Sequence, residues 1–207
     1  MVSLLVVRAH PLTSSDSLSM RLTDEFVRAY TEQNPDHRVT DLRLYDVAIP
    51  EIDGDLLRAW NQLREGIPFA RLDNFAQSKV TLFDHYTRQF LESDKVVIAN
   101  PLWNLQVPTR LKAWIDTITV GGTTFAYNPD GTPVGLVTGK RALHIQTAGG
   151  VFGSNDPASQ FMRTLLGFIG VTDLTQIAAE GVDHEPERAP EIEADALRRV
   201  AAVARTF

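Results

Sequence analysis

Hydroxyl side chains crowd one short segment near the start of the sequence, RAHPLTSSDSLSMRL, residues 8–22. Four serines fall within residues 14–19, where an apolar pattern with helical spacing begins at Leu18. The beginning of a helix presents free backbone N–H groups and the positive end of the helix dipole, and together with hydroxyl donors these suit a phosphate. A serine or Asp16 that only caps the helix would explain the same residues.

The sequence carries neither of the glycine-rich loops that hold larger nucleotides. It contains no GxGxxG dinucleotide fingerprint and no GxxxxGK followed by Ser or Thr. The hydroxyl-rich segment therefore favours a terminal monophosphate over NAD in a Rossmann site or a nucleoside triphosphate.

Two further polar segments follow apolar runs. The stretch PLWNLQVP, residues 101–108, comes directly after the apolar run 96–99 and puts Trp103 and Asn104 where a flat ring could rest. The stretch QTAGGV, residues 146–151, follows another apolar run, and its paired glycines let backbone N–H groups approach a ligand closely. Ordinary packing of the tryptophan and a plain surface turn are the alternatives.

Apolar runs that alternate with helical patterns predict the elements that position these segments. This alternation is typical of a parallel sheet covered by helices on both faces. The expected strands are Val2–Val7, Arg38–Leu44, Val96–Asn100, Arg141–Gln146 and Leu174–Ala179. A final helix is expected at about 191–204, and a less regular insertion at 50–71 with a short helix at 55–64.

The three polar segments follow the first, third and fourth of these strands. In an open parallel sheet, ligands bind beyond the carboxyl ends of the strands. A phosphate loop after the first strand and ring loops after the third and fourth are what a flavodoxin-type FMN site requires. We therefore expect one flavodoxin-like α/β domain over residues 1–207, with a five-stranded parallel sheet in the order 2-1-3-4-5 and helices on both faces.

Composition excludes several classes of function. The net charge is -6 and the 20 Lys and Arg residues are scattered, which argues against a nucleic-acid surface. The chain has no cysteine, and its histidines lack metal-ligand spacing, so neither thiolate chemistry nor a metal site is expected. The N-terminal apolar run is too short for a signal peptide or a membrane span, so we expect no membrane partner and a cytoplasmic location.

Several stretches carry a resemblance to a known family. The stretches AHPL with SLSMRLTDEF, PLWNLQVPTRLKAWID, GGTTFAYNPDGTPVGLVTGKRALHIQTAGG, LGFIGVTD and AEG resemble, in the same order, the FMN-dependent NADH-azoreductases. These are flavodoxin-like quinone and azo reductases, and the similarity runs over nearly the whole chain. The resemblance implies a homodimer with one FMN per subunit at each end of the interface.

Carried over position by position, the resemblance implies three groups of cofactor-binding residues. Ser17, Leu18 and Ser19, with His10, match the FMN phosphate segment; Leu102, Trp103, Asn104 and Leu105 match the segment along the isoalloxazine; Thr147, Ala148, Gly149 and Gly150 match the turn at the flavin edge. Ala148 stands where many relatives have arginine, and His10 where some have serine. Phe125 and Tyr127 are expected to wall the substrate pocket, whereas His144, between two apolar neighbours in a strand, is interpreted as a core histidine.

The implied activity is hydride transfer from NADH through flavin N5 to quinones and aromatic azo compounds by a ping-pong route, without a catalytic side chain. Backbone N–H groups at Gly149 and Gly150 are expected to stabilise negative charge on the reduced flavin. Three alternatives remain open: an NADPH-preferring quinone or nitro reductase, a flavodoxin-type electron carrier without enzyme activity, and a flavodoxin-like domain without a cofactor.

Overall fold

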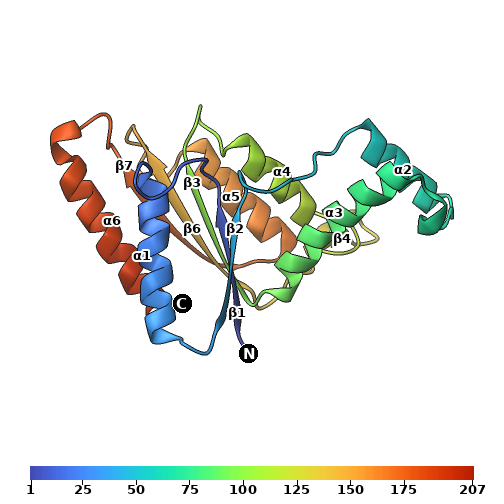
Figure 1. The fold of residues 1–207 in the computed structure, drawn as a ribbon, viewed down its shortest axis with the longest axis horizontal. Helices are drawn as coiled ribbons and strands as arrows, with labels where there is room; N and C mark the ends of the chain where they lie inside the picture. The colour runs from blue at the N-terminus through green and yellow to red at the C-terminus, as the bar shows by residue number, and fades with distance from the viewer.

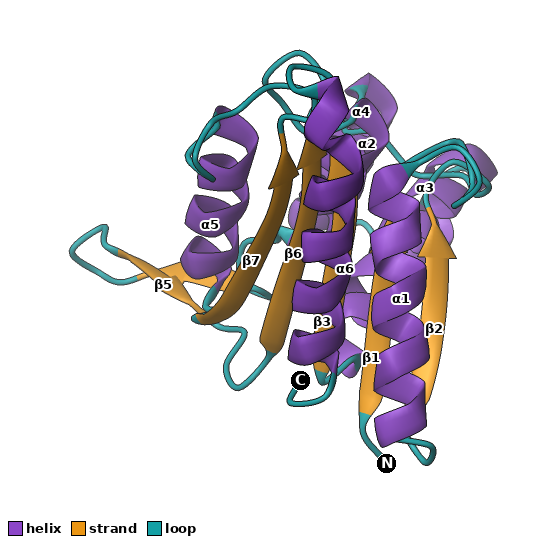
Figure 2. Ribbon diagram, turned by 90° about the vertical axis from the view of Figure 1, so that its left-hand side faces the viewer, coloured by secondary structure: helices purple, strands orange, loops and turns teal.

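A five-stranded parallel sheet forms the centre of the computed structural model, which describes all of residues 1–207 (Figures 1 and 2). Its strands lie in the order β2-β1-β3-β6-β7. Their bounds are β1 Ser3–Arg8, β2 Arg38–Arg43, β3 Lys95–Pro101, β6 Arg141–Ala148 and β7 Asp173–Glu180. The expected parallel sheet is confirmed, and each strand lies within one or two residues of its expected bounds.

Two short strands outside this sheet were not expected. Strands β4, Phe125–Tyr127, and β5, Pro133–Gly135, form an antiparallel hairpin of their own. Three-residue strands are too short to show a period of two, so no sequence pattern predicted them.

Alternation along the central strands divides the core into two layers. In β1, Leu5 and Val7 contact the apolar cluster beneath α3, α4 and α5, whereas Leu4 and Val6 contact the cluster beneath α1 and α6. Successive side chains of a strand point to opposite faces, so a strand buried on both faces reads as one continuous apolar run.

Helices cover both faces, as expected (Figure 2). Their bounds are α1 Leu18–Gln33, α2 Gly54–Arg64, α3 Asn74–Glu92, α4 Thr109–Ile118, α5 Pro157–Ile169 and α6 Ala189–Ala204, with short 3-10 turns at Phe69–Arg71 and Pro186–Arg188. Helix α5 ends at Gly170, whose φ of 103° is the left-handed conformation that favours glycine after a last helical turn. No helix combines the length and the apolar character needed to cross a membrane.

Residues 50–71, expected as an irregular insertion, form an arm together with the first half of α3. The arm extends from the body of the molecule (Figure 1). Helix α2 packs on the first half of α3 around a small cluster of its own that includes Leu56, Val80 and Phe83. The ring of Trp60 lies edge-on to Phe83, with ring centroids 4.9 Å apart. Trp60 is therefore a packing residue of the arm within this chain.

Candidate functional site

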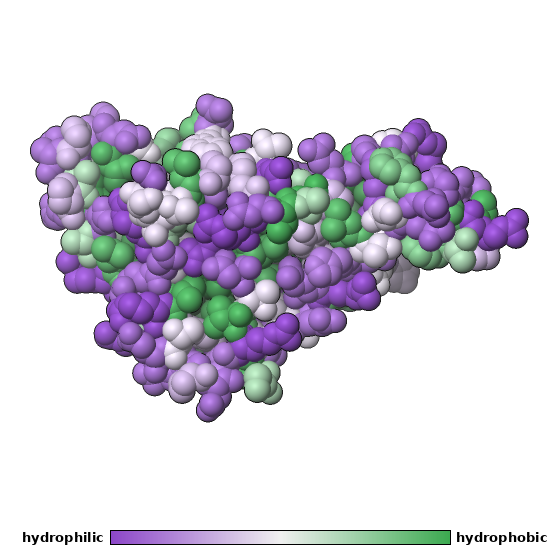
Figure 3. Space-filling model, in the orientation of Figure 1, coloured by the Kyte–Doolittle hydropathy of each residue, from purple (hydrophilic) through white to green (hydrophobic).

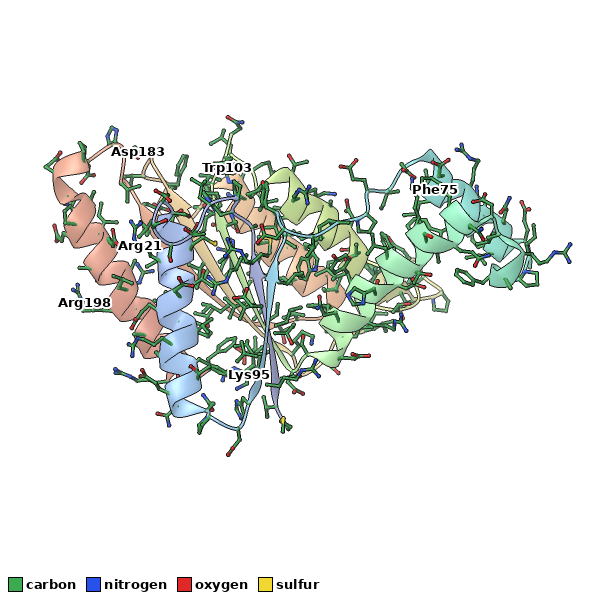
Figure 4. All side chains as sticks on the ribbon, in the orientation of Figure 1. Arg21, Phe75, Lys95, Trp103, Asp183 and Arg198 are labelled. Carbon is green, nitrogen blue, oxygen red and sulfur yellow. The ribbon has the colours of Figure 1, made fainter.

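The carboxyl ends of β1, β3 and β6 bring the three polar segments together at one edge of the sheet. The rings of His10, after β1, and Trp103, after β3, have centroids 5.5 Å apart. The Leu102 N–H donates to the Thr147 carbonyl at 2.7 Å, which joins the segment after β3 to the end of β6. Figure 4 shows Trp103 above this edge of the sheet.

The first loop ends at the beginning of α1. Ser17 caps the helix, since its Oγ accepts from the Met20 N–H at 3.4 Å, and it lies 3.0 Å from the Oγ of Ser19. The N–H groups of Leu18 and Ser19 find no acceptor within the protein. Both serines are buried, and the bond between their hydroxyls uses one of the two hydroxyl protons. The capping role and the phosphate role are still compatible, because the capped helix presents free N–H groups and the second hydroxyl proton has no acceptor within the protein.

His10 lies beside this loop as a neutral side chain. Its Nδ1 accepts from the Leu12 N–H at 3.0 Å, which leaves the proton on Nε2. Partial burial lowers the pKa of His10 below its ordinary value. At neutral pH the imidazole therefore offers an N–H donor without a positive charge.

The second loop is a tight turn with a strained backbone. Trp103 and Gln106 exchange main-chain hydrogen bonds of 3.0 and 2.9 Å, so Asn104 and Leu105 are the two central residues of the turn. Their φ angles are 50° and 62°, a conformation that asparagine tolerates and leucine rarely adopts. The turn holds the apolar side chains of Trp103 and Leu105 outward, with 40% and 52% of their surfaces exposed.

The third loop exposes N–H groups because its carbonyls are engaged elsewhere. The carbonyls of Ala148, Gly149 and Gly150 all accept hydrogen bonds from N–H groups within residues 181–184. The N–H groups of Gly149, Gly150 and Val151 have no acceptor within the protein. Three adjacent donors are thus available at the edge of the sheet.

Gly149 has no room for a side chain. A Cβ at this position would lie 2.2 Å from the Oδ2 of Asp183, whose carboxylate rests against the glycine. Asp183 lies in the loop that follows β7. It is exposed, but it also covers one side of the glycine turn.

A buried polar network lies in the layer beneath the site. His144 Nε2 lies 2.8 Å from Asn100 Oδ1, and Gln176 Nε2 lies 3.1 Å from His144 Nδ1. Asn100 in turn donates to the Pro101 carbonyl at 2.9 Å, at the point where the second loop leaves β3. Burial lowers the pKa of His144 to about 4, so the ring is neutral and serves as a core residue, as interpreted from the sequence.

Sequence reasoning missed the rest of this network. Gln146 donates to Asp156 at 2.9 Å, and Asp156 caps α5 by accepting from the Ser159 N–H at 2.9 Å. The polar residues inside the apolar strand β6 could have indicated this network, because a buried amide needs hydrogen-bond partners.

Phe125 and Tyr127 do not join the three loops. Their hairpin packs on the last turn of α5, where the Val137 N–H donates to the Ile169 carbonyl at 2.9 Å and the Phe125 and Phe168 rings have centroids 4.6 Å apart. The last turn of α5 leads into the beginning of β7, which is the amino edge of the sheet, opposite the site (Figure 2). Within one chain these two aromatics therefore cannot wall a pocket over the three loops.

The geometry fits a flat ligand with a terminal phosphate. Hydroxyl and N–H donors at a helix start face one end of the site, exposed apolar side chains lie at its middle, and free N–H groups lie at its other end. A doubly wound parallel sheet in this strand order, with its ligand loops at the carboxyl edge, has the architecture of flavodoxin-like proteins.

Comparisons with known proteins agree with this class. A family described as having a flavodoxin-like fold matches residues 3–204. The chain therefore belongs to this flavodoxin-like family, in the group that includes FMN-dependent NADH:quinone oxidoreductases and azoreductases.

Relatives match over their full length. The FMN-dependent NADH:quinone oxidoreductases of Geobacillus kaustophilus and Macrococcus caseolyticus are 39% and 38% identical, with 100% of both chains covered in each case. The crystal structure of an azoreductase from Bacillus anthracis is 32% identical over 100% of both chains, with a TM-score of 0.92. An FMN-dependent NADH-azoreductase from Bacillus anthracis, solved in complex with FMN, is 27% identical over 99% of this chain and 98% of that chain, with a TM-score of 0.90.

Proposed function

We propose that this protein is an FMN-dependent oxidoreductase that takes electrons from NADH and reduces quinones and aromatic azo compounds. One observation carries the proposal: the loops after β1 and β6 both present N–H groups without protein acceptors, on either side of the exposed Trp103 turn. The relatives named as FMN-dependent NADH:quinone oxidoreductases support the cofactor, the donor and the acceptor class.

FMN, when bound, supplies the ring that accepts a hydride from a nicotinamide and passes it to the second substrate. The chain's own task is to hold that ring. The Ser17 and Ser19 hydroxyls and the Leu18 N–H at the start of α1 bind the phosphate, with His10 as a neutral donor nearby. The helix dipole adds to this binding because its positive end faces the anion.

The second and third loops bind the ring. Trp103 and Leu105 supply apolar contacts, and Asn104 supplies an amide whose hydrogen bonds the protein does not use. The N–H groups of Gly149 and Gly150 donate to the polar edge of the ring and stabilise negative charge there, as oxyanion-hole donors do.

Thr147 and Ala148 act through the backbone. The Thr147 carbonyl holds the second loop through Leu102, while the buried methyl group of Ala148 supplies no cationic contact where many relatives have arginine. His10 is the only ionisable side chain among the twelve expected cofactor residues, so the chemistry relies on binding and orientation rather than on acid or base catalysis.

The protein acts as a homodimer in this proposal. The arm carries exposed apolar side chains, among them Leu57, Phe69 and Phe75, which a second copy would cover. If the site lies at the interface, the hairpin of the partner copy is the source of Phe125 and Tyr127 for the substrate pocket. A cytoplasmic location stays a prediction.

An anaerobic absorbance titration tests the proposal. The purified protein is loaded with FMN, then treated with NADH and afterwards with a benzoquinone; loss and return of the flavin band are expected. Persistence of the oxidised band with NADH would favour the electron carrier, and faster bleaching by NADPH would favour the NADPH-preferring reductase. Failure to bind FMN would contradict all three loop assignments.

A pair of variants tests the phosphate loop in the same assay. Replacement of both Ser17 and Ser19 by alanine removes the hydroxyl groups of the phosphate loop and should weaken FMN binding by about tenfold or more. The matched control is Ser78→Ala, an exposed serine on α3, which should leave the FMN dissociation constant unchanged.

A further inference from the structure

Glu180, the last residue of β7, holds the loop that follows β6. Its carboxylate accepts three successive backbone N–H groups, from Phe152 at 2.8 Å, Gly153 at 2.7 Å and Ser154 at 2.8 Å. Hydrogen bonds to an ionised acceptor are about twice as strong as neutral ones. Three of them on one carboxylate form an anion-binding nest that this chain fills with its own side chain.

The backbone of the nest needs such a partner. Gly153 and Ser154 have φ angles of 63° and 57°, both in the left-handed region. The conformation is natural for glycine but strained for serine, and it aims successive N–H dipoles at one point. The Glu180 carboxylate offsets the backbone strain at Ser154 and the repulsion between the aligned N–H dipoles. Loss of its charge should therefore release the loop.

The residues after Glu180 hold the other end of the same loop. The Gly181 N–H donates to the Ala148 and Gly150 carbonyls at 3.0 and 2.9 Å, and the His184 N–H donates to the Gly149 carbonyl at 3.0 Å. These bonds occupy the carbonyl side of the two glycines and leave their N–H side free. Figure 4 shows Asp183, in the same turn, at the carboxyl edge that also bears Trp103.

We infer that Glu180 is a positioning residue for the cofactor: its carboxylate fixes the loop of residues 149–155 so that the N–H groups of Gly149 and Gly150 face the ring edge. This inference rests on the proposed function, because those two N–H groups bind the ring only if FMN is the ligand. Glu180 itself does not touch the ligand, since its oxygens are engaged by residues 152–154.

The test compares Glu180→Gln with Glu187→Gln, an exposed glutamate a few residues further along. Glutamine keeps the size but removes the charge, and its NH2 group cannot accept an N–H. Amide hydrogen exchange at residues 152–154 of the FMN-free protein, whose N–H groups donate to Glu180, should become about tenfold faster or more. The FMN dissociation constant should rise by about tenfold, and the flavin midpoint potential should fall because the reduced ring loses aligned donors. Glu187→Gln should match the wild type in all three measurements.

A second substitution separates positioning from simple destabilisation. Ser154→Gly, introduced into the Glu180→Gln protein, removes the left-handed strain and should restore part of the FMN affinity. Wild-type hydrogen exchange, affinity and potential in Glu180→Gln would overturn the inference, and so would a loss of unfolding free energy with unchanged affinity and potential. A wild-type protein that does not bind FMN would overturn the proposed function, and this role with it.

Discussion

Individual residues at the carboxyl edge of the sheet adopt unfavourable backbone conformations. All three non-glycine residues with positive φ lie in the second loop or just after the third: Asn104, Leu105 and Ser154. Strain of this kind persists where the surrounding structure enforces it, and it concentrates at ligand sites. The strained residues therefore mark the same edge as the free N–H groups.

Leu105→Gly should stabilise the protein without its cofactor. The substitution creates an Asn-Gly pair, the preferred centre of a turn with two positive φ angles, and the lost leucine is half exposed. We expect the free energy of unfolding, measured by urea titration, to rise by up to about 1 kcal/mol. Asn104→Gly is the control and should change it less. A loss of more than about 1 kcal/mol in Leu105→Gly would show that leucine packing outweighs the strain.

His144 should make the protein acid-sensitive in a defined window. Burial holds the folded-state pKa at about 4, below the ordinary value of 6.5, so the unfolded chain takes up the proton first as the pH falls. Stability from this group is fully present above pH 6.5 and is lost between pH 6.5 and pH 4, by about 3 kcal/mol in total. Urea titrations at several pH values should show this slope, and it should be smaller in His144→Gln. Equal slopes in both proteins would contradict the assignment.

Among the secondary-structure elements, the hairpin of β4 and β5 depends on a close approach of two glycines. A Cβ on Gly135 would lie 2.2 Å from the backbone nitrogen of Gly170, at the end of α5. Backbone atoms cannot yield as a flexible side chain can, so only glycine lets the hairpin contact α5 at this point.

Gly135→Ala should therefore displace the hairpin from α5. We expect a fall in the free energy of unfolding of about 2 kcal/mol or more, the size typical of overpacking. Gly167→Ala is the matched control, because nothing lies within 4 Å of its Cβ and alanine favours the helix. It should raise the stability by up to about 1 kcal/mol. Urea titration measures the free energy of unfolding of both variants. Equal effects of the two substitutions would argue against a close contact between Gly135 and Gly170.

At the scale of the whole molecule, the arm is the part whose apolar side chains a single chain does not cover. Helix α2 packs mainly on α3, and apolar side chains remain exposed along the arm (Figures 1 and 3). Phe75, labelled in Figure 4, is 60% exposed. Several large apolar side chains exposed on one projecting part of a molecule indicate an interaction site.

Phe75→Asp should weaken the proposed homodimer. Light scattering of the wild type should give twice the 23.0 kDa of one chain, and the variant should shift toward 23.0 kDa at micromolar concentration. A buried, unpaired charge at an interface disfavours association, which is the reason for the shift. Ala202→Asp on α6, at the far end of the molecule from the arm, should remain dimeric. A monomeric wild type would contradict the homodimer directly.

The sequence by itself determined the sheet and most of its helices. The apolar runs of β1 and β3 are continuous because parallel strands are buried on both faces. Such a run can be recognised in the sequence without knowledge of the tertiary contacts. The left-handed conformation of Gly170 after α5 also has a local cause, because glycine is the residue that adopts it most easily after a last helical turn. The three ligand loops were predicted from their places after particular strands.

Only the tertiary structure decided what those loops present. The free N–H groups of Gly149 and Gly150 depend on bonds from residues 181–184, and the nest around Glu180 joins β7 to the loop after β6. The position of Phe125 at the amino edge likewise depends on packing against Phe168. Such contacts join residues distant in the chain, and no local pattern specifies them because hydrogen bonding and packing are settled only when the elements meet.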